Sequence, residues 1–332
     1  MKKRGVSISN ENNNFLGYEV EENGYLKTTT RYGCESDWHD LQLYSRKLGV
    51  LIQFRDEKAV VIVNNFEYTQ HKKISEVLKT LLVKKHLDKA KLLSLQGSFF
   101  NLIDVDNKNS HCVYYNWSIS DVLISFTVKA RLNILPTNFT LHIWDRDKDP
   151  SCSLCHHPSE SMAHLLNSCP KFKNFRSRRH DRLVSKLFDF IKGNSQFDVF
   201  ENKLVRTVMP EVQRHLIGLE HTKPDIFCIQ GKTIIIVEVT VCYDLYMSLS
   251  YENKVHIYMP LVNVLKDLGY DVRLMVLCFG SLGTVHKSIF SSLRYFSKDN
   301  VKVKALIKWC SISAIIGANY IWRYRLRFLT AD

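Results

Sequence analysis

The sequence predicts an α/β protein in which a mixed sheet is flanked by helices and preceded by a mostly helical basic region and a small zinc knuckle. Three observations support this prediction. Two apolar strand patterns joined by a turn occupy residues 222–240, three cysteines and a histidine are grouped at 152–169, and apolar residues recur at helical spacing on either side. The apolar fraction of 45% is ordinary for a folded protein, so a sizeable core is expected.

The net charge restricts the expected partners, and the cysteine usage restricts the expected class of protein. The chain of 332 residues has a formal net charge of +13, and a surplus of this kind favours polyanions, either nucleic acid or an anionic membrane face. No apolar run reaches the ~18–20 residues of a membrane span, and none follows the basic start, so we expect no membrane partner and no signal peptide. Nine cysteines, an odd number and mostly scattered, do not indicate a secreted disulfide scaffold.

Composition and periodicity divide the chain into five expected segments. The first is loosely structured because its start is rich in Asn, Glu, Ser and Thr, although 50–64 could supply short strands. Helices are expected at 70–95 and at 118–136, the latter capped near Ser118 or Ser120 and stopped by Pro136. The expected segments are a loose N-terminal segment (1–69), a basic helical linker region (70–145), the knuckle (146–175), a domain that contains the sheet (176–300) and a C-terminal helix (301–332).

The cysteine group has the spacing of a metal site. Its members are Cys152, Cys155, His164 and Cys169, in the order Cys-x2-Cys-x8-His-x4-Cys. Two thiolates on one turn can hold one side of a zinc ion, and the later His and Cys complete a closed structural tetrahedron. His156 and His157 are the reserve ligands, and the alternative is a coincidence of three buried thiols and a loop histidine.

The strand pair raises a second question, because carboxylates interrupt it. A two-residue loop at Gly231-Lys232, with Gly first as a type II′ turn prefers, places Asp225 directly opposite Glu238. Both faces of the pair are otherwise apolar, which predicts a central strand pair covered on both sides. One face carries Phe227, Ile229, Ile234 and Ile236, and the other carries Ile226, Cys228, Ile235, Val237 and Val239.

Two opposed carboxylates destabilise a sheet unless a cation lies between them. Mg²⁺ suits Asp225 and Glu238, because it takes one or two carboxylates and completes its shell with water and phosphate oxygens. Lys254, on the helical stretch expected at 246–268, could complete such a site. The alternative is that Asp225 only begins a strand after Pro224 and that Glu238 faces solvent at a sheet edge.

A basic run follows the knuckle and supplies candidate nucleic-acid contacts. These candidates are Lys171, Lys173, Arg176, Arg178, Arg179, His180 and Arg182. His180 could instead be a capping residue before a helix at 181–192, and Asp181 is equally well explained as its N-cap. Asp244 and Glu252 are expected to be solvated surface residues.

The order Pro224-Asp225, Glu238 after twelve intervening residues, and then Lys254 resembles the restriction-like endonuclease of site-specific non-LTR retrotransposons. These are type-1 elements that insert into ribosomal RNA genes, and their nuclease belongs to the PD-(D/E)xK superfamily. In that family the lysine has moved from the second strand to the next helix, and here Thr240 occupies the ordinary lysine position.

Further motifs resemble the same family over residues 75–326. They are the Cys-x2-Cys-x8-His-x4-Cys knuckle, Arg179-His180-Asp181, and the segments 129–138 and 310–325. The family usually has Asp where this chain has Glu238, and no polymerase signature is present in the sequence. Pro260 is expected to kink the helical stretch just beyond Lys254.

The resemblance implies a restriction-endonuclease-like core and a Mg-dependent DNA endonuclease that nicks target DNA to prime reverse transcription. In this role Asp225 and Glu238 would bind Mg²⁺, and Lys254 would orient or polarise the attacking water or the phosphate. The implied partners are a DNA target, the element RNA and the reverse transcriptase region of a full-length polyprotein, and the implied location is the nucleus. The alternative is a catalytically inactive zinc-knuckle fragment that binds nucleic acid.

Overall fold

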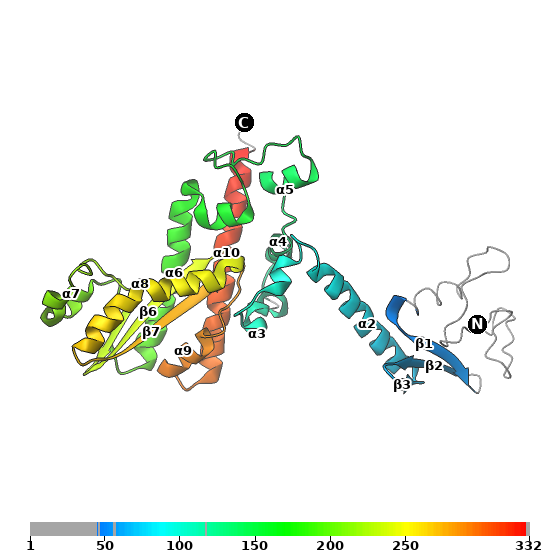
Figure 1. Ribbon diagram of the computed structural model, residues 1–332, viewed down its shortest axis with the longest axis horizontal. Coiled ribbons are helices and arrows are strands. Elements are labelled where there is room, and N and C mark those ends of the chain that lie inside the picture. Colours follow the sequence, from blue (N-terminus) through cyan, green and yellow to red (C-terminus); the bar gives the residue numbers. More distant parts are fainter. Residues whose placement is uncertain (1–44, 46, 56–57, 117, 330–332) are drawn as a thin grey trace. The chain divides into compact units, whose positions relative to one another are not determined.

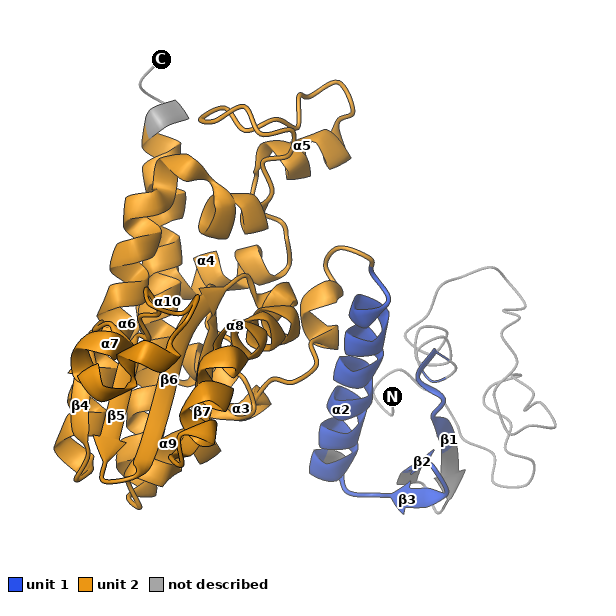
Figure 2. Cartoon of the chain, turned by 60° about the vertical axis from the view of Figure 1, so that its left-hand side comes forward, with its two compact units in different colours: residues 1–93 blue, residues 94–332 orange. Residues whose placement is uncertain are grey.

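The computed structural model describes residues 45, 47–55, 58–116 and 118–329 (Figure 1). The chain divides into two compact units, residues 1–93 and residues 94–332 (Figure 2). Most of the N-terminal segment that the sequence predicts to be loose lies outside the described residues. Among the described residues, every helix is too short or too polar to span a lipid bilayer.

The first unit contains a small antiparallel sheet and one long helix. Its sheet has the order β1-β2-β3, and its helix follows directly. The apolar side chains of Val50, Val61 and Val63 pack against the helix residues Ile74 and Leu78. The strands expected at 50–64 and the helix expected at 70–95 are therefore confirmed, while β3 is an addition. The bounds are β1 Leu51–Arg55, β2 Lys58–Val63, β3 Phe66–Tyr68 and α2 His71–Lys91.

A four-stranded mixed sheet lies at the centre of the second unit, in the order β4-β5-β6-β7. Neighbours are antiparallel except β6 and β7, which are parallel. The predicted register is confirmed, because Gln230 pairs with Thr233, and Gly231 has the positive φ (57°) that the turn requires. Only β4 is absent from the sequence prediction. The bounds are β4 Asp198–Glu201, β5 Ile226–Gln230, β6 Thr233–Cys242 and β7 Asp271–Gly280.

Helices cover both faces of this sheet, as the apolar faces of β5 and β6 predict. Ile226, Cys228, Ile235, Val237 and Val239 pack against α6, α9 and α10, in the core cluster that we call the sheet core. Phe227, Ile234 and Ile236 pack against α7 and α8 on the other face. The helix α8 continues through Pro260. The bounds are α6 Lys173–Asn194, α7 Val205–Val208, α8 Met247–Asp267, α9 Ile289–Phe296 and α10 Asn300–Leu329.

A second core cluster, which we call the knuckle core, joins the upstream helices to the second half of α10. Leu123 and Phe126 of α4 pack with Ile315 and Ile321 of α10 and with Cys169. The helix expected at 118–136 is confirmed with Ser120 as its cap, since the Ser120 hydroxyl accepts a hydrogen bond from the Leu123 N–H group. It ends before Pro136. The bounds are α3 Asn107–Ser110, α4 Asp121–Arg131 and α5 Asn138–Trp144.

The helix α10 serves both clusters, although the sequence indicates a separate C-terminal segment. Its first half contributes Val303 and Ile307 to the sheet core, and its second half contributes Ala318 and Trp322 to the knuckle core. It runs beside α6, which is seen in Figure 1 as the red and green helices. Residues 300–329 are therefore part of the second unit and not an appendage.

The start of α6 differs from the prediction. The helix was expected to begin at residue 181 with Asp181 as N-cap, but it begins at Lys173, so Asp181 lies inside it. The basic run therefore forms the first turns of a helix. Because helical side chains point in all directions around the axis, Arg179 is buried while Arg178 is exposed.

Asp244 is also misplaced by the sequence prediction, because it is buried and not at the solvated surface. Its carboxylate accepts hydrogen bonds from the N–H groups of Leu282 (2.8 Å) and Thr284 (3.2 Å) and from the Thr284 hydroxyl (2.7 Å). We expect Asp244→Ala to lower the free energy of unfolding by about 2–4 kcal/mol, since buried donors lose their acceptor. Urea denaturation beside the exposed Asp267→Ala measures this, and equal midpoints for the two variants would contradict it.

Candidate functional site

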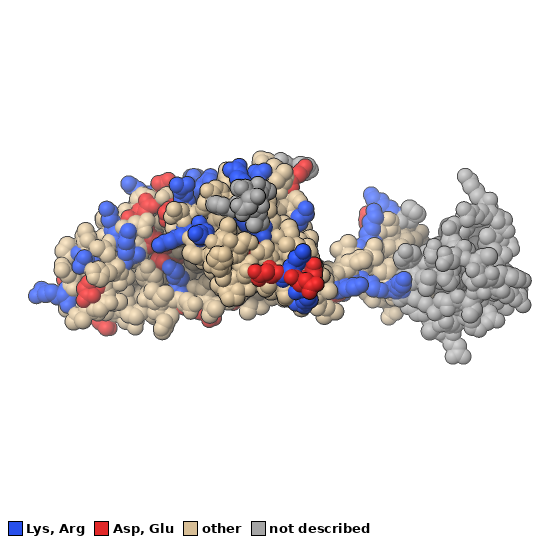
Figure 3. All heavy atoms as spheres, turned by 90° about the horizontal axis from the view of Figure 1, so that it is seen from above, with Lys and Arg blue, Asp and Glu red and all other residues tan. Residues whose placement is uncertain are grey.

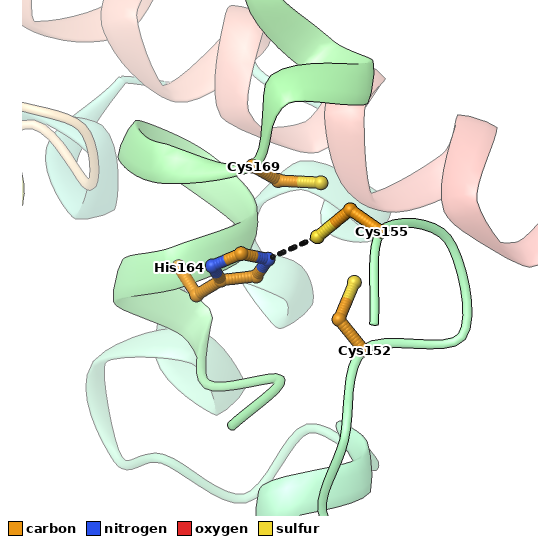
Figure 4. A group of neighbouring side chains, drawn as sticks. All are labelled: Cys152, Cys155, His164 and Cys169. Atoms are coloured by element: carbon orange, nitrogen blue, oxygen red, sulfur yellow. Dashed lines mark hydrogen bonds between the residues drawn. The ribbon is translucent and has the colours of Figure 1, made fainter. Parts of the chain in front are cut away.

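The four predicted zinc ligands converge in the structure. The ligand atoms of Cys152, Cys155, His164 and Cys169 all lie within 4.8 Å of one another, and they point toward a common centre (Figure 4). Sγ of Cys155 lies 3.3 Å from Nε2 of His164. The group contains neither His156 nor His157. Three thiols and one imidazole at this separation match a closed tetrahedral zinc site.

Local backbone geometry brings these ligands together. The Cys152 N–H group donates to the His157 carbonyl oxygen (2.8 Å) and the His156 N–H group donates back to the Cys152 carbonyl oxygen (2.8 Å), which closes a tight turn. The Cys169 N–H group donates to the His164 carbonyl oxygen (2.7 Å) at the end of a short helical segment. The His157 ring stacks on the His164 ring at 4.4 Å and orients it.

Burial disfavours free thiolates in this group. Cys152 and Cys169 are fully buried, and burial raises the pKa of Cys152 to about 12 and raises the pKa of Cys169. A bound metal cation reverses this effect, because it stabilises the thiolate form directly. The chemistry of the four donors therefore fits zinc as a structural ion, with all four positions taken by the protein.

The carboxylate pair lies where β5 begins beside β6. Asp225 and Glu238 are only 8% and 3% exposed, so the alternative in which Glu238 faces solvent at a sheet edge is wrong. Oδ2 of Asp225 accepts a hydrogen bond from the Val239 N–H group (2.8 Å), and Oε2 of Glu238 lies 3.4 Å from the Asp225 amide nitrogen. Each carboxylate thus contacts the strand that carries the other one.

Lys254 reaches this pair from α8. Its Nζ lies 2.5 Å from Oε1 of Glu238 and is partly exposed. One turn later on the same helix, the Tyr258 hydroxyl donates to the Lys223 carbonyl oxygen at 3.4 Å, just before Asp225. The structure therefore brings Asp225, Glu238 and Lys254 together, as the sequence predicts, although Pro260 lies in the same helix.

His180 is a fourth member of this site, and its place there is absent from the sequence prediction. Its Nε2 lies 3.4 Å from Oδ2 of Asp225 and 3.1 Å from the Val239 carbonyl oxygen. Its Nδ1 lies 3.2 Å from Oδ1 of Asp181. It is therefore neither a helix cap nor a free surface residue. Forty-odd residues separate it from Asp225, so no local pattern reveals the contact.

Within this site the pKa values of His180, Asp225 and Glu238 are shifted in different directions. Burial lowers the pKa of His180, but the hydrogen bond and charge of Asp225 outweigh it and bring that pKa to about 9. Burial favours the neutral form of Asp225, but His180 and the Val239 N–H group hold its pKa below the usual value. Burial and the charge of Asp225 raise the pKa of Glu238, which Lys254 only partly offsets. Such divergence between neighbouring carboxyl groups is typical of functional sites.

The part of the chain that contains the zinc group matches a known protein family. A family model described as zinc-binding in reverse transcriptase matches residues 97–175, which include all four zinc ligands. The chain is also 26% identical, over 174 residues, to the "Retrovirus-related Pol polyprotein from type-1 retrotransposable element R2" of Popillia japonica. The chain is therefore similar to a retrotransposon polyprotein. The match covers 51% of the chain and 33% of that relative, so the chain spans about a third of its length.

The predicted basic contacts divide into two groups in the structure. Lys171, Lys173, Arg178 and Arg182 are exposed and can meet a polyanion. The others are not free at the surface: Arg176 donates to the Cys169 carbonyl oxygen beside the zinc group, Arg179 is buried with Nη2 at 3.1 Å from the Leu166 carbonyl oxygen, and His180 meets Asp225. Two basic side chains thus support the knuckle instead of lying on the outer surface.

Proposed function

We propose that Asp225, Glu238 and Lys254 form the active site of a Mg-dependent DNA endonuclease. The observation that carries this proposal is the burial of two carboxylates against each other, with a lysine 2.5 Å from one of them. Two buried like charges cost folding free energy, and a protein that only binds nucleic acid has no use for them. A divalent cation bound by the pair at the start of β5 would give the two carboxylates a catalytic role.

The side chains have separate roles in this proposal. Mg²⁺ bound by Asp225 and Glu238 would supply an activated water and stabilise the charge that develops on the phosphate. Lys254 is long and partly exposed, so it can turn from Glu238 toward a phosphate oxygen or the attacking water. His180 donates to Oδ2 of Asp225 and to the Val239 carbonyl oxygen, which positions the Asp225 carboxylate from the α6 side.

The substrate and partners follow from the same proposal. A nick in target DNA would expose a 3′ hydroxyl from which a reverse transcriptase region of a full-length polyprotein could copy element RNA. The net charge of +13 favours such polyanions, and Lys and Arg side chains are spread over the face of residues 94–332 in Figure 3. A protein that nicks chromosomal DNA would act in the nucleus.

Nicking of supercoiled plasmid by zinc-loaded protein tests the proposal. We expect nicking in the presence of Mg²⁺ and no nicking with Ca²⁺ or in metal-free buffer. The metal-free buffer contains no chelator, because a chelator would also remove zinc. Asp225→Asn and Lys254→Met should each reduce the nicking rate at least about 100-fold, because the first removes a carboxylate ligand of Mg²⁺ and the second removes the cation that would act on the phosphate or the water. Glu252→Gln, an exposed position on the same helix as Lys254, is the matched control and should nick at the normal rate.

The competing function is nucleic-acid binding without chemistry. It predicts no nicking by the unaltered chain under any metal, with zinc content and DNA affinity intact. Nicking that persists at full rate in Asp225→Asn would also refute the assignment, because the activity would then reside elsewhere.

A further inference from the structure

A long groove lies between α6 and α10, apart from the carboxylate site. Three cavities of about 290, 520 and 440 Å³ lie along α10 and share lining residues. Side chains of α6 line the first and the third, whereas Asn116, Ser118, Ile119, Ser120 and Leu123 line much of the second. The first two share Arg182 and Tyr320, and the last two share Trp309. We call this feature the α6–α10 groove, defined by Arg178, Arg182 and Lys186 of α6 and by Trp309, Tyr320 and Arg323 of α10.

The groove is positively charged and its cations are unopposed. Arg178, Arg182 and Arg323 are exposed, and within the described part of the chain none of them forms an ion pair with a carboxylate. Among the described residues that line the three cavities, Asp189 is the only acidic one. A surface on which cations far outnumber carboxylates is complementary to a chain of phosphates.

Aromatic rings lie between these cations. The guanidinium carbon of Arg182 and Nζ of Lys186 lie 5.3 and 5.5 Å from the Trp309 ring, so two cations crowd one indole. Tyr320 is 62% exposed and lies eleven residues after Trp309, about three turns further along α10. Alternating basic and aromatic side chains along a groove are the arrangement on which single-stranded nucleic acid is held, with phosphates on the cations and bases on the rings.

Two buried polar groups beside the groove lack partners. The Ser313 hydroxyl, and Nε and Nη1 of Arg179, have no hydrogen-bond partner among the described residues, and both residues line the groove. Arg179 lies over Gly317, where an added Cβ would come within 2.8 Å of its side-chain carbons. These atoms have almost no exposed surface, so a ligand in the groove would meet the exposed cations and rings instead.

We propose that the α6–α10 groove binds single-stranded DNA. Single-stranded DNA suits this surface because its phosphates can meet the exposed arginines while its unpaired bases stack on Tyr320, whereas the bases of a duplex are already stacked on one another. DNA is favoured over RNA because α6 also carries His180, which contacts Asp225, so the groove and the site of the proposed nuclease share a helix. In this respect the inference rests on the proposed function. The groove would hold the strand freed beside a nick.

The test is fluorescence anisotropy of a labelled oligothymidylate with the zinc-loaded full chain in Mg-free buffer, where no cleavage competes. Arg182→Ala should weaken binding several-fold and reduce the slope of log affinity against log salt by about 0.7, the value for one phosphate contact to a single strand. Tyr320→Ala should weaken binding about fivefold or more through lost stacking. Both positions are exposed, so both variants should fold normally.

Lys266→Ala, an exposed lysine on α8 away from the groove, is the matched control for charge. Equal effects of Arg182→Ala and Lys266→Ala, or tighter binding of a DNA duplex than of the single strand, would overturn the proposal. Tighter binding of oligouridylate would assign the groove to RNA and also overturn it. Asp225→Asn should bind oligothymidylate normally, because Asp225 lies outside the groove. If the unaltered chain bound the single strand but did not nick DNA, that result would count only against the nuclease.

Discussion

Replacement of a zinc ligand, Cys152→Ser, is expected to abolish tight zinc binding and to destabilise the second unit by several kcal/mol or more. Structural zinc contributes on the order of 10 kcal/mol to the folding of small knuckles. Here the effect should spread, because Cys152 and Cys169 are themselves part of the knuckle core with Ile315 and Ile321 of α10. Zinc content by atomic emission and the thermal unfolding midpoint measure the two results.

Cys112→Ser is the control, since Cys112 is a free cysteine outside the metal group whose Sγ lies 3.6 Å from the Ser311 hydroxyl. It should retain one zinc ion and its unfolding midpoint. A Cys152→Ser protein that kept stoichiometric zinc and an unchanged midpoint would show that the ion is bound elsewhere.

A second large loss of stability is expected from Arg325→Met. Glu160 and Arg325 are both buried, and Nε of Arg325 donates to Oε1 of Glu160 at 2.9 Å. The same oxygen accepts the Asn138 N–H group at 3.1 Å. Removal of the guanidinium leaves a buried carboxylate without its counter-ion, which costs about 3–5 kcal/mol. Chemical denaturation measures the loss.

Arg323→Met is the matched control on the same helix, because Arg323 is exposed and should change the free energy of unfolding little. The double variant Glu160→Gln, Arg325→Met should recover part of the loss, since it removes the buried charge as well. Equal destabilisation by Arg323→Met and Arg325→Met would mean that the pair does not hold α10 to the segment before His164.

The parts of the fold that depend on local chemistry could be predicted from the sequence. Gly231 sets the turn, the turn sets the register, and the register places Asp225 beside Glu238. In the same way, the spacing of the four zinc ligands along the chain is sufficient to predict that they lie close together. β4 escaped prediction because a strand of four residues at the sheet edge has little periodicity of its own.

The parts of the site that depend on packing between distant elements could not be predicted. The first turns of α6 contain mostly polar residues, so their sequence indicates an exposed run, and only the packing of α6 against α10 decides that Arg179 is buried over Gly317. The same packing turns His180 toward Asp225. Asp244 was misjudged for a related reason, because its hydrogen-bond donors come from a loop about forty residues later.

The position of α10 in both core clusters has a consequence for protein synthesis. The zinc ligands and both carboxylates leave the ribosome well before residues 300–329, yet each cluster needs side chains of that helix. Part of the apolar surface of each cluster therefore stays exposed in the nascent chain until α10 emerges. At ~5–20 residues per second, this exposure lasts for seconds. The order of translation therefore means that the sheet core and the knuckle core can complete their packing only after α10 has been made.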